Sequence, residues 1–365
     1  MPASPTTSVR QPPPPRAIAW WLAICAAMIF IMVVIGGATR LTESGLSMVE
    51  WKPLHVVPPL NEAQWQDEFS AYRTSPEYLL KNAGMSLGDF KKIYWFEFTH
   101  RLWGRIIGIV FALPLLWFIW RGAVDRPLFY KLGGLFVLGG AQGALGWFMV
   151  ASGLVDRPDV SQYRLAAHLC LAFTVYGLIV WVALDLFGKD APASVRLDPA
   201  TRRLSAVLPF FALVVIGAGA FVAGINAGLI YNTFPLMDGR VIPEALYSMD
   251  PWYLSAFEDA TTVQFNHRVA AITLVILVAV AWWRGRGAAA GRTQTVLNAL
   301  MIMALVQAAL GISTLVLQVP LGLALAHQAG ALMLFTLTVW FAHTQRRVRA
   351  EPARAGSPLH AEPAE

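Results

Sequence analysis

The sequence predicts an all-α integral membrane protein whose eight transmembrane helices form two pseudo-symmetric four-helix bundles. Three observations predict this fold: an apolar composition, eight hydrophobic runs, and matched motifs in the two halves of the chain. Of the 365 residues, 56% are hydrophobic and 14% are charged, and the mean hydropathy is +0.54. A soluble domain of this size could not hide so much apolar surface from water. The lipid bilayer is therefore the expected solvent.

Eight apolar runs are long enough to be transmembrane helices, because about 20 residues cross a hydrocarbon core of roughly 30 Å. The predicted spans are residues 17–38, 97–120, 131–152, 162–187, 205–226, 263–284, 295–317 and 322–343. They divide the chain into an N-terminal half (17–187) and a C-terminal half (205–343), joined by a cytoplasmic linker (188–204). Residues 1–16, with a run of four prolines, and residues 344–365 are predicted to be cytoplasmic tails. The first tail and the segment after Arg354 are expected to be disordered.

The distribution of Lys and Arg predicts which side of the membrane each loop occupies, because cytoplasmic loops carry an excess of these residues. One side holds both tails and most of the basic residues, whereas the other holds two long loops, at 39–96 and 227–262. We therefore expect both termini in the cytoplasm and a location in the bacterial inner (plasma) membrane. The first span is too long for a signal peptide, so it is predicted to remain as an anchor. The net charge of +6 is spread over short segments, which argues against nucleic acid as a partner.

Three short motifs recur in the same order in the two halves. The sequence Glu-Phe-Thr-His-Arg begins at Glu97, and Gln-Phe-Asn-His-Arg begins at Gln264. The third span of each half carries Gln-Xaa-Ala-Leu-Gly, beginning at Gln142 and Gln307, and the fourth span carries Ala-His. The recurrence predicts a duplicated unit with parallel copies, because four spans return the chain to the side on which it started.

Four histidines occupy equivalent places near the outer ends of the even-numbered spans: His100, His168, His267 and His327. A lone histidine in a bilayer most often makes a hydrogen bond between helices, but four at equal depth in a repeated frame indicate ligands. Zinc would require three or four ligands, and the two cysteines, Cys25 and Cys170, do not lie at matching depth in the two halves. Two histidines in each half suit the axial ligation of heme iron between helices.

Arginines next to these histidines could pair with heme propionates or could anchor the helices at the membrane interface. These arginines are Arg101, Arg105, Arg164 and Arg268. The sequence leaves the two roles open. The other histidines lie in the outer loop, at an inner helix end and in the C-terminal tail, and no role is assigned to His55, His343 or His360.

The two halves differ at the residue three positions before the first histidine, which is Glu97 in one half and Gln264 in the other. A carboxylate beside a heme ligand can transfer protons and stabilise a developing positive charge. Glu97 could equally be a carboxylate at the membrane rim that pairs with Arg101. Three functions remain open from the residues alone: an oxidoreductase acting on heme, a bis-histidine diheme electron-transfer cytochrome, and a heme carrier or exporter.

Together with the outer segment Gly-Gly-Ala-Thr-Arg-Leu-Thr-Glu-Ser-Gly-Leu-Ser (36–47), these motifs resemble the heme A synthase family over nearly the whole chain. The resemblance implies an oxidoreductase that oxidises the C8 methyl group of heme O to a formyl group, giving heme A for terminal oxidases. It also implies that the N-terminal half takes the substrate and that the C-terminal half keeps a bound heme b. The implied roles are catalytic carboxylate for Glu97, ligands of the substrate heme for His100 and His168, and ligands of heme b for His267 and His327.

The first outer loop lacks the cysteine pair that some bacterial members of the family carry, so the resemblance is to the cysteine-free type of proteobacteria and mitochondria. Within this loop, aromatic residues at helical intervals in Asn61–Arg73 predict a short amphipathic helix lying on the outer surface, where it could cap the substrate pocket. The resemblance also implies an electron-transfer partner. Cooperation with heme O synthase, contact with membrane lipid and a homo-oligomer are further expectations.

Overall fold

The computed structural model describes residues 15–50, 57–153, 160–188 and 195–346. The described residues form no β-strand, and eight of their helices are long and apolar enough to cross a membrane. These helices are α1 (Pro15–Leu41), α4 (Leu87–Trp120), α5 (Arg126–Gly153), α6 (Gln162–Phe187), α7 (Pro199–Gly224), α9 (Ala260–Gly285), α10 (Gly291–Val316) and α11 (Leu321–Arg346). The predicted all-α fold with eight spans is confirmed. Most of both predicted tails, together with His55 and His360, lies outside the described residues.

α4 and α7 are the long helices that begin farthest before their predicted starts. α4 starts at Leu87 rather than at residue 97, and Ser86 caps it by accepting a hydrogen bond from the backbone N–H of Asp89 (3.1 Å). The first turns of α4 carry three charged residues, so a search for apolar runs does not detect them. α7 starts at Pro199, inside the predicted linker, because the side chain of Asp198 accepts hydrogen bonds from the first backbone N–H groups of the helix.

The first outer loop contains two short helices, α2 (Glu62–Tyr72) and α3 (Pro76–Leu80). The predicted helix over 61–73 is confirmed, with Asn61 as its N-cap. Its apolar side chains are buried against α4, where the rings of Trp65 and Tyr94 meet edge to face with centroids 5.0 Å apart. The added turns of α4 cover the apolar face of this helix. Its place on the outer surface and its role as a cap over the substrate pocket stay predictions.

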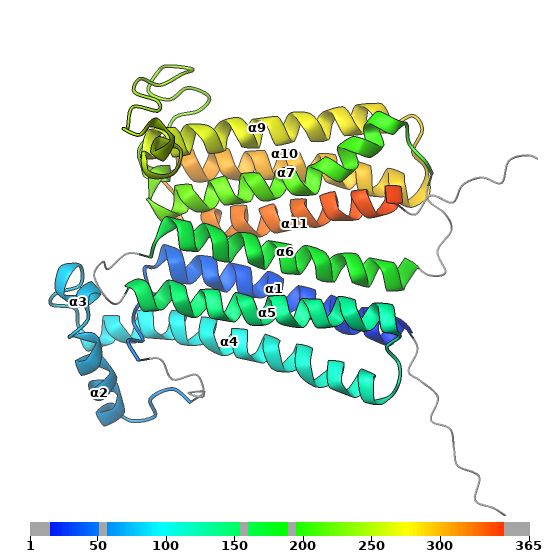
Figure 1. The fold of residues 1–365 in the computed structure, drawn as a ribbon. Coiled ribbons are helices and arrows are strands. Elements are labelled where there is room, and N and C mark those ends of the chain that lie inside the picture. The colour runs from blue at the N-terminus through cyan, green and yellow to red at the C-terminus, as the bar shows by residue number, and fades with distance from the viewer. Residues whose placement is uncertain (1–14, 51–56, 154–159, 189–194, 347–365) are drawn as a thin grey trace, which may run out of the picture.

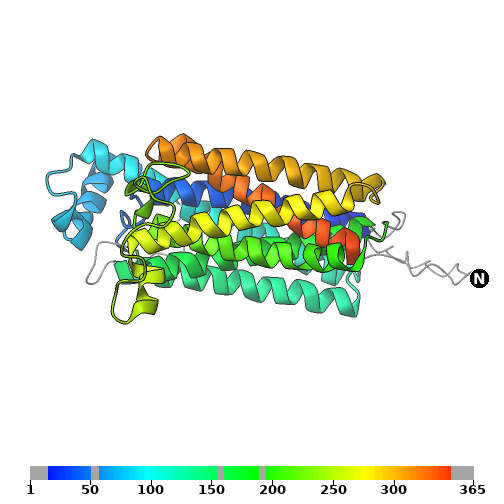
Figure 2. The ribbon, with the colours of Figure 1, turned by 90° about the horizontal axis from the view of Figure 1, so that it is seen from above.

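The long helices lie side by side in one elongated bundle (Figures 1 and 2). α4, α5, α1 and α6 make up one side of the bundle, and α11, α7, α10 and α9 make up the other (Figure 1). α1 begins and α11 ends at the same end of the bundle, whereas α2, α3 and the segment before α9 lie at the opposite end (Figure 1). The long loops therefore lie away from the end at which the described chain starts and stops.

The helix contacts of one half recur in the other. α1 packs against α4 and α6, as α7 packs against α9 and α11, and α6 contacts α5 as α11 contacts α10. The halves meet through α1, α6, α7 and α11, with α1 touching α11 and α6 touching α7. A duplicated four-helix unit would make these contacts.

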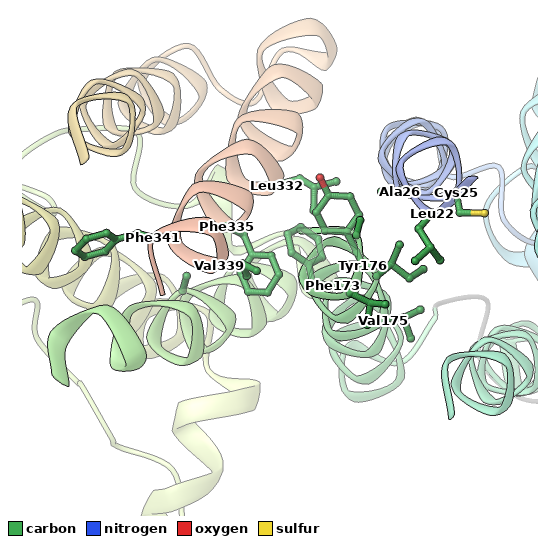
Figure 3. Packing of buried hydrophobic residues seen from close by; sticks show 14 of the residues in the cluster. Leu22, Cys25, Ala26, Phe173, Val175, Tyr176, Leu332, Phe335, Val339 and Phe341 are labelled. Carbon is green, nitrogen blue, oxygen red and sulfur yellow. The ribbon is translucent and has the colours of Figure 1, made fainter. Parts of the chain in front are cut away.

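Large side chains of α1, α6 and α11 fill the centre of the bundle (Figure 3). Phe173 of α6 meets Phe335 of α11 edge to face, with ring centroids 5.6 Å apart. A Cβ at Gly177 would lie 2.9 Å from the Phe335 ring, so glycine allows the two helices to approach closely. The hydroxyl groups of Tyr176 and Thr336 are hydrogen-bonded across the same interface (2.8 Å). This packing fixes α6 against α11, the fourth helix of each half.

Candidate functional site

Each of the four predicted histidine ligands lies against a glycine on a neighbouring helix of its own half. An ideal Cβ at the glycine would come within 3.0 Å or less of the Cε1 atom of the imidazole, so a larger residue there would have to displace the ring. The pairs are Gly36 with His100, Gly146 with His168, Gly219 with His267, and Gly311 with His327. The sequence identified Gly146 and Gly311 only as parts of a repeated motif, whereas the structure shows that they make room for the imidazoles.

The histidines are also paired within each half. His100 and His168 are close enough to interact electrostatically, and so are His267 and His327. All four rings are half-buried, and the Nδ1 atoms of His100 and His267 have no hydrogen-bond partner among the described residues. His100 lies farther from the start of its helix than the other three, because α4 begins earlier than predicted.

Two imidazoles in each half form a ligand set typical of heme iron, which is held axially between helices. Within the described ranges, no three His, Cys, Asp or Glu side chains gather closely enough to hold a metal ion. The candidate metal ligands are thus the histidine pairs themselves. An apolar helix bundle also provides the walls that a porphyrin face requires.

A glutamine four residues before two of these glycines contacts the histidine as well. Gln142 Nε2 donates to the carbonyl oxygen of His168 (3.0 Å) and lies 3.1 Å from the Nδ1 and 3.2 Å from the Nε2 of its ring. Gln307 Nε2 donates to the carbonyl oxygen of His327 (3.0 Å) and lies 3.1 Å from its Nδ1. The sequence predicted no role for either glutamine, although their recurrence at a fixed spacing before a glycine was an available signal.

Glu97 is buried near His100, with 2% of its surface exposed. Its Oε2 accepts hydrogen bonds from the hydroxyl of Ser47 (2.7 Å) and from the backbone N–H of Met48 (2.8 Å), and its Oε1 is ion-paired with Arg101. Arg101 also donates to the carbonyl oxygen of Met48 (3.0 Å). The ion pair that the sequence left open is therefore present within α4. The hydrogen bonds of its two side chains to Ser47 and Met48 fasten the start of the outer loop to α4.

Gln264 and Arg268 make corresponding contacts in the C-terminal half. Gln264 Nε2 donates to the carbonyl oxygens of Ala227 (2.9 Å) and Tyr231 (3.2 Å), and Arg268 donates to that of Tyr231 (2.7 Å). Met48 and Tyr231 both lie twelve residues after the glycine that faces the histidine, so the two arginines hold equivalent loop positions. The side chain three positions before the first histidine is thus a carboxylate in the N-terminal half (Glu97) and a neutral amide in the C-terminal half (Gln264).

The arginines at the outer rim are bound to groups of the protein. The Arg164 guanidinium lies 4.1 Å from the ring centroid of Phe148, while Arg101 and Arg268 hold the loop carbonyls. Each of these three arginines thus has a partner within the protein, and their anchoring at the membrane interface stays a prediction. Arg268 retains a buried Nε with no hydrogen-bond partner among the described residues, so it keeps a donor for an acidic group of a ligand. Pairing of these arginines with propionates stays a prediction.

The outer loop contains a buried acid that the sequence did not single out. Glu77 of α3 is 3% exposed, and its burial raises the pKa of the carboxyl to about 7. The Tyr72 hydroxyl donates to Glu77 Oε2 (3.1 Å), and Asn82 Nδ2 donates to the Tyr72 hydroxyl (2.7 Å). This short polar chain lies beside the aromatic contacts between α2 and α4, so the loop is a packed structure rather than a loose connection.

Comparison with known proteins finds one family and several relatives that are similar to most of the chain. The COX15-CtaA family, described as cytochrome oxidase assembly protein, matches residues 19–339. A heme A synthase of Nitrosospira multiformis is 52% identical over 324 residues, which cover 88% of this chain and 91% of that protein. Heme A synthases of Paramagnetospirillum magneticum and Parvibaculum lavamentivorans are 48% and 50% identical, each over 87% of this chain and 90% of the relative.

Proposed function

The chain belongs to the COX15-CtaA family of cytochrome oxidase assembly proteins, and from that membership we infer that it is a heme A synthase. It is thus an oxidoreductase that converts heme O into heme A. The observation that carries this conclusion is 52% identity to a heme A synthase over 88% of the chain. The two histidine pairs support it, because the reaction requires both a bound heme substrate and a route for electrons.

We assign the substrate to the N-terminal half and a resident heme b to the C-terminal half. The difference between Glu97 and Gln264 supports this division. Oxidation of a methyl group to a formyl group removes protons as well as electrons, so an ionisable side chain is useful where the chemistry occurs. A resident cofactor requires only ligands and a fitted pocket, which a neutral amide does not disturb.

The residues of the C-terminal half fit a heme. His267 and His327 would supply the axial ligands, and Gly219 and Gly311 leave space at their rings. The buried Nε of Arg268, without a hydrogen-bond partner among the described residues, would donate to a propionate. Heme b, when bound, would supply one-electron transfer between an external partner and the substrate.

In the N-terminal half, His100 and His168 would hold the substrate, and Glu97 would take up a proton from the reacting group. Oε2 of the carboxylate accepts hydrogen bonds from Ser47 and Met48, and Oε1 is ion-paired with Arg101. A carboxylate has about four acceptor positions, so these contacts leave one on Oε1 at which a proton would be taken up. A positioned acid or base of this kind contributes about 10²- to 10⁴-fold to the rate.

Eight apolar helices make the chain a multi-pass membrane protein. We propose that it lies in the bacterial inner membrane with both termini in the cytoplasm, because Lys and Arg concentrate in the segments at the end of the bundle where α1 begins and α11 ends. The histidines and the long loops would then lie toward the outer side. An electron-transfer partner, and a heme O synthase that hands over its apolar product directly, are the proposed partners.

Extraction and chromatography of hemes from cells that express the chain together with a source of heme O test this function. Heme A should appear in these cells and should be absent from matched cells without the chain. Unconverted heme O, in membranes that contain the protein in normal amounts, would contradict the assignment. An electron-transfer cytochrome or a heme exporter would give that second result.

A further inference from the structure

The two histidines of each half are held in different ways. His168 and His327 each contact the side-chain amide of a glutamine. Its Nε2 lies at hydrogen-bond distance from both the carbonyl oxygen and the ring Nδ1 of the histidine. His100 and His267 contact a glycine in the same manner, but their Nδ1 atoms have no hydrogen-bond partner among the described residues. The glutamine contact occurs in both halves, so it belongs to the repeated design of the site. The His267 ring has no hydrogen bond to a glutamine among the described residues and interacts instead with the backbone of Val215.

The two glutamines also carry an unused acceptor. The Oε1 atoms of Gln142 and Gln307 are buried, and neither has a hydrogen-bond partner in the part of the chain that the structure describes. A histidine that binds metal through one ring nitrogen donates the N–H of the other nitrogen to an acceptor, which fixes the ring. A rotation of the terminal amide exchanges Nε2 and Oε1. It would bring this acceptor to the Nδ1 of the ring, in exchange for the hydrogen bond that Nε2 donates to the histidine carbonyl oxygen.

A second glycine makes room for the amide in the C-terminal half. A Cβ at Gly330, three residues after His327 on α11, would lie 2.3 Å from Gln307 Oε1. Glycine inside a helix costs about 1 kcal/mol relative to alanine. Space for the Gln307 side chain is a physical reason for glycine at this position, and it shows that the amide fits closely beside the ring.

We propose that the glutamine of each half is a positioning residue: the histidine that it holds is the fixed heme ligand, and the other histidine is able to release iron. The fixed ligands are then His168 and His327, and the releasable ligands are His100 and His267. The proposal rests on the proposed function, because it requires that the histidine pairs bind heme. In the N-terminal half, His168 keeps the substrate oriented while His100 turns away from the iron. This movement allows heme O to enter the site and heme A to leave it.

The test uses the full chain purified with its heme b, because that heme can be followed without turnover. Gln307→Leu keeps a side chain of similar size and removes both the donor and the acceptor. Gln294→Leu is the matched control, since Gln294 lies on the same helix and bonds Asn298 rather than a histidine. The measurements are the rate of heme b transfer to apomyoglobin, the low-spin fraction by electron paramagnetic resonance, and the midpoint potential of heme b.

Gln307→Leu should speed the release of heme b by about 10- to 100-fold, the usual effect of losing a residue that orients a metal ligand. It should also raise the midpoint potential, because a histidine without an acceptor at Nδ1 is a weaker donor to iron. Gln307→Glu, which supplies a permanent acceptor, should lower the potential. Gly330→Ala should reproduce the leucine variant by pushing the amide aside, and Gln294→Leu should change nothing.

The ligands themselves give the second test. His267→Ala should keep a high-spin heme b held by His327, whereas His327→Ala should lose the heme. Equal retention in these two variants, or a Gln307→Leu protein that matches Gln294→Leu, would overturn the proposal. A wild-type protein that binds no heme b at all would instead contradict the proposed cofactor, so the two failures are distinguishable.

Discussion

The imidazole of His327 lies against the Cα atom of Gly311, so closely that a Cβ at position 311 would be 2.8 Å from His327 Cε1. The orientation of the ring on α11 therefore depends on a residue of α10. The same relationship holds for the other three histidines, with a different helix providing each glycine. The position of each proposed ligand is set by the packing of two helices and not by its own helix alone.

Gly311→Ala should therefore displace His327 and weaken the binding of heme b. Alanine favours a helix more than glycine does, so the helix itself should persist. The absorption spectrum of the purified protein should show a reduced low-spin fraction and less heme per chain. Gly322→Ala on α11 is the control, because a Cβ there meets no atom within 4 Å. An unchanged spectrum in the Gly311 variant would show that ligation of heme b by His327 does not depend on the close contact between its ring and Gly311.

The orientation of the chain can be measured at Ser70, an exposed residue of α2. If the first outer loop faces the outside, Ser70→Cys should react with a membrane-impermeant thiol reagent added to intact spheroplasts. The wild-type chain is the control, since Cys25 is buried and Cys170 lies within a transmembrane helix. Reaction only after lysis would reverse the proposed topology.

The buried acid in α3 should make the outer loop sensitive to pH. Burial raises the pKa of Glu77 from 4.5 to about 7, so between these values the folded loop keeps a proton that the unfolded loop has lost. Stability of the loop should therefore fall as the pH rises from about 4.5 to 7, by up to about 3 kcal/mol, and should stay lower above that range. Hydrogen exchange of the amides in α2 and α3, corrected for intrinsic rates, measures this change.

Glu77→Gln should remove most of this pH dependence and should slow exchange in the loop at pH 8, because the side chain then carries no charge to bury. Glu62→Gln is the control, since the Glu62 side chain is 67% exposed and pairs with Lys91 at the surface. Equal pH dependence in the wild-type chain and the Glu77 variant would mean that another group dominates the titration of the loop.

The eight spans could be predicted from the sequence because each one presents a long apolar run to lipid. The start of α4 could not, because its first turns project beyond the apolar run and are stabilised by the Ser86 cap and by packing against α2. A hydropathy search detects the lipid-facing part of a helix and misses its polar extension. The same reason explains why Pro199–Leu204 seemed part of a linker and is helical.

The candidate site was predictable in part. The histidines and Glu97 are chemically distinctive and recur in a repeated frame, so their positions were visible in the sequence. The contact of Glu97 with Ser47 and Met48 joins residues about fifty positions apart, and no local pattern reveals it. The glycines behind the rings were also hidden, because close approach between helices is a property of the fold.

The central claim is that the N-terminal half performs the oxidation and that Glu97 takes part in it. Glu97→Gln keeps the size of the side chain and can still accept hydrogen bonds from Ser47 and Met48, so the protein should fold and retain heme b. Glu62→Gln is the matched control: it removes an exposed carboxylate of α2 that pairs with Lys91, so conversion should stay close to normal. Gln264→Glu should not create a second active site, because we assign a resident heme, and not the substrate, to that half.

The ratio of heme A to heme O in membranes that carry Glu97→Gln tests this claim most directly. Loss of a positioned acid or base costs about 10²- to 10⁴-fold in rate. We therefore expect heme O to accumulate and heme A nearly to vanish, while the heme b spectrum stays intact. Near-normal heme A production by this variant would contradict the account, and would reduce Glu97 to a residue that holds the outer loop.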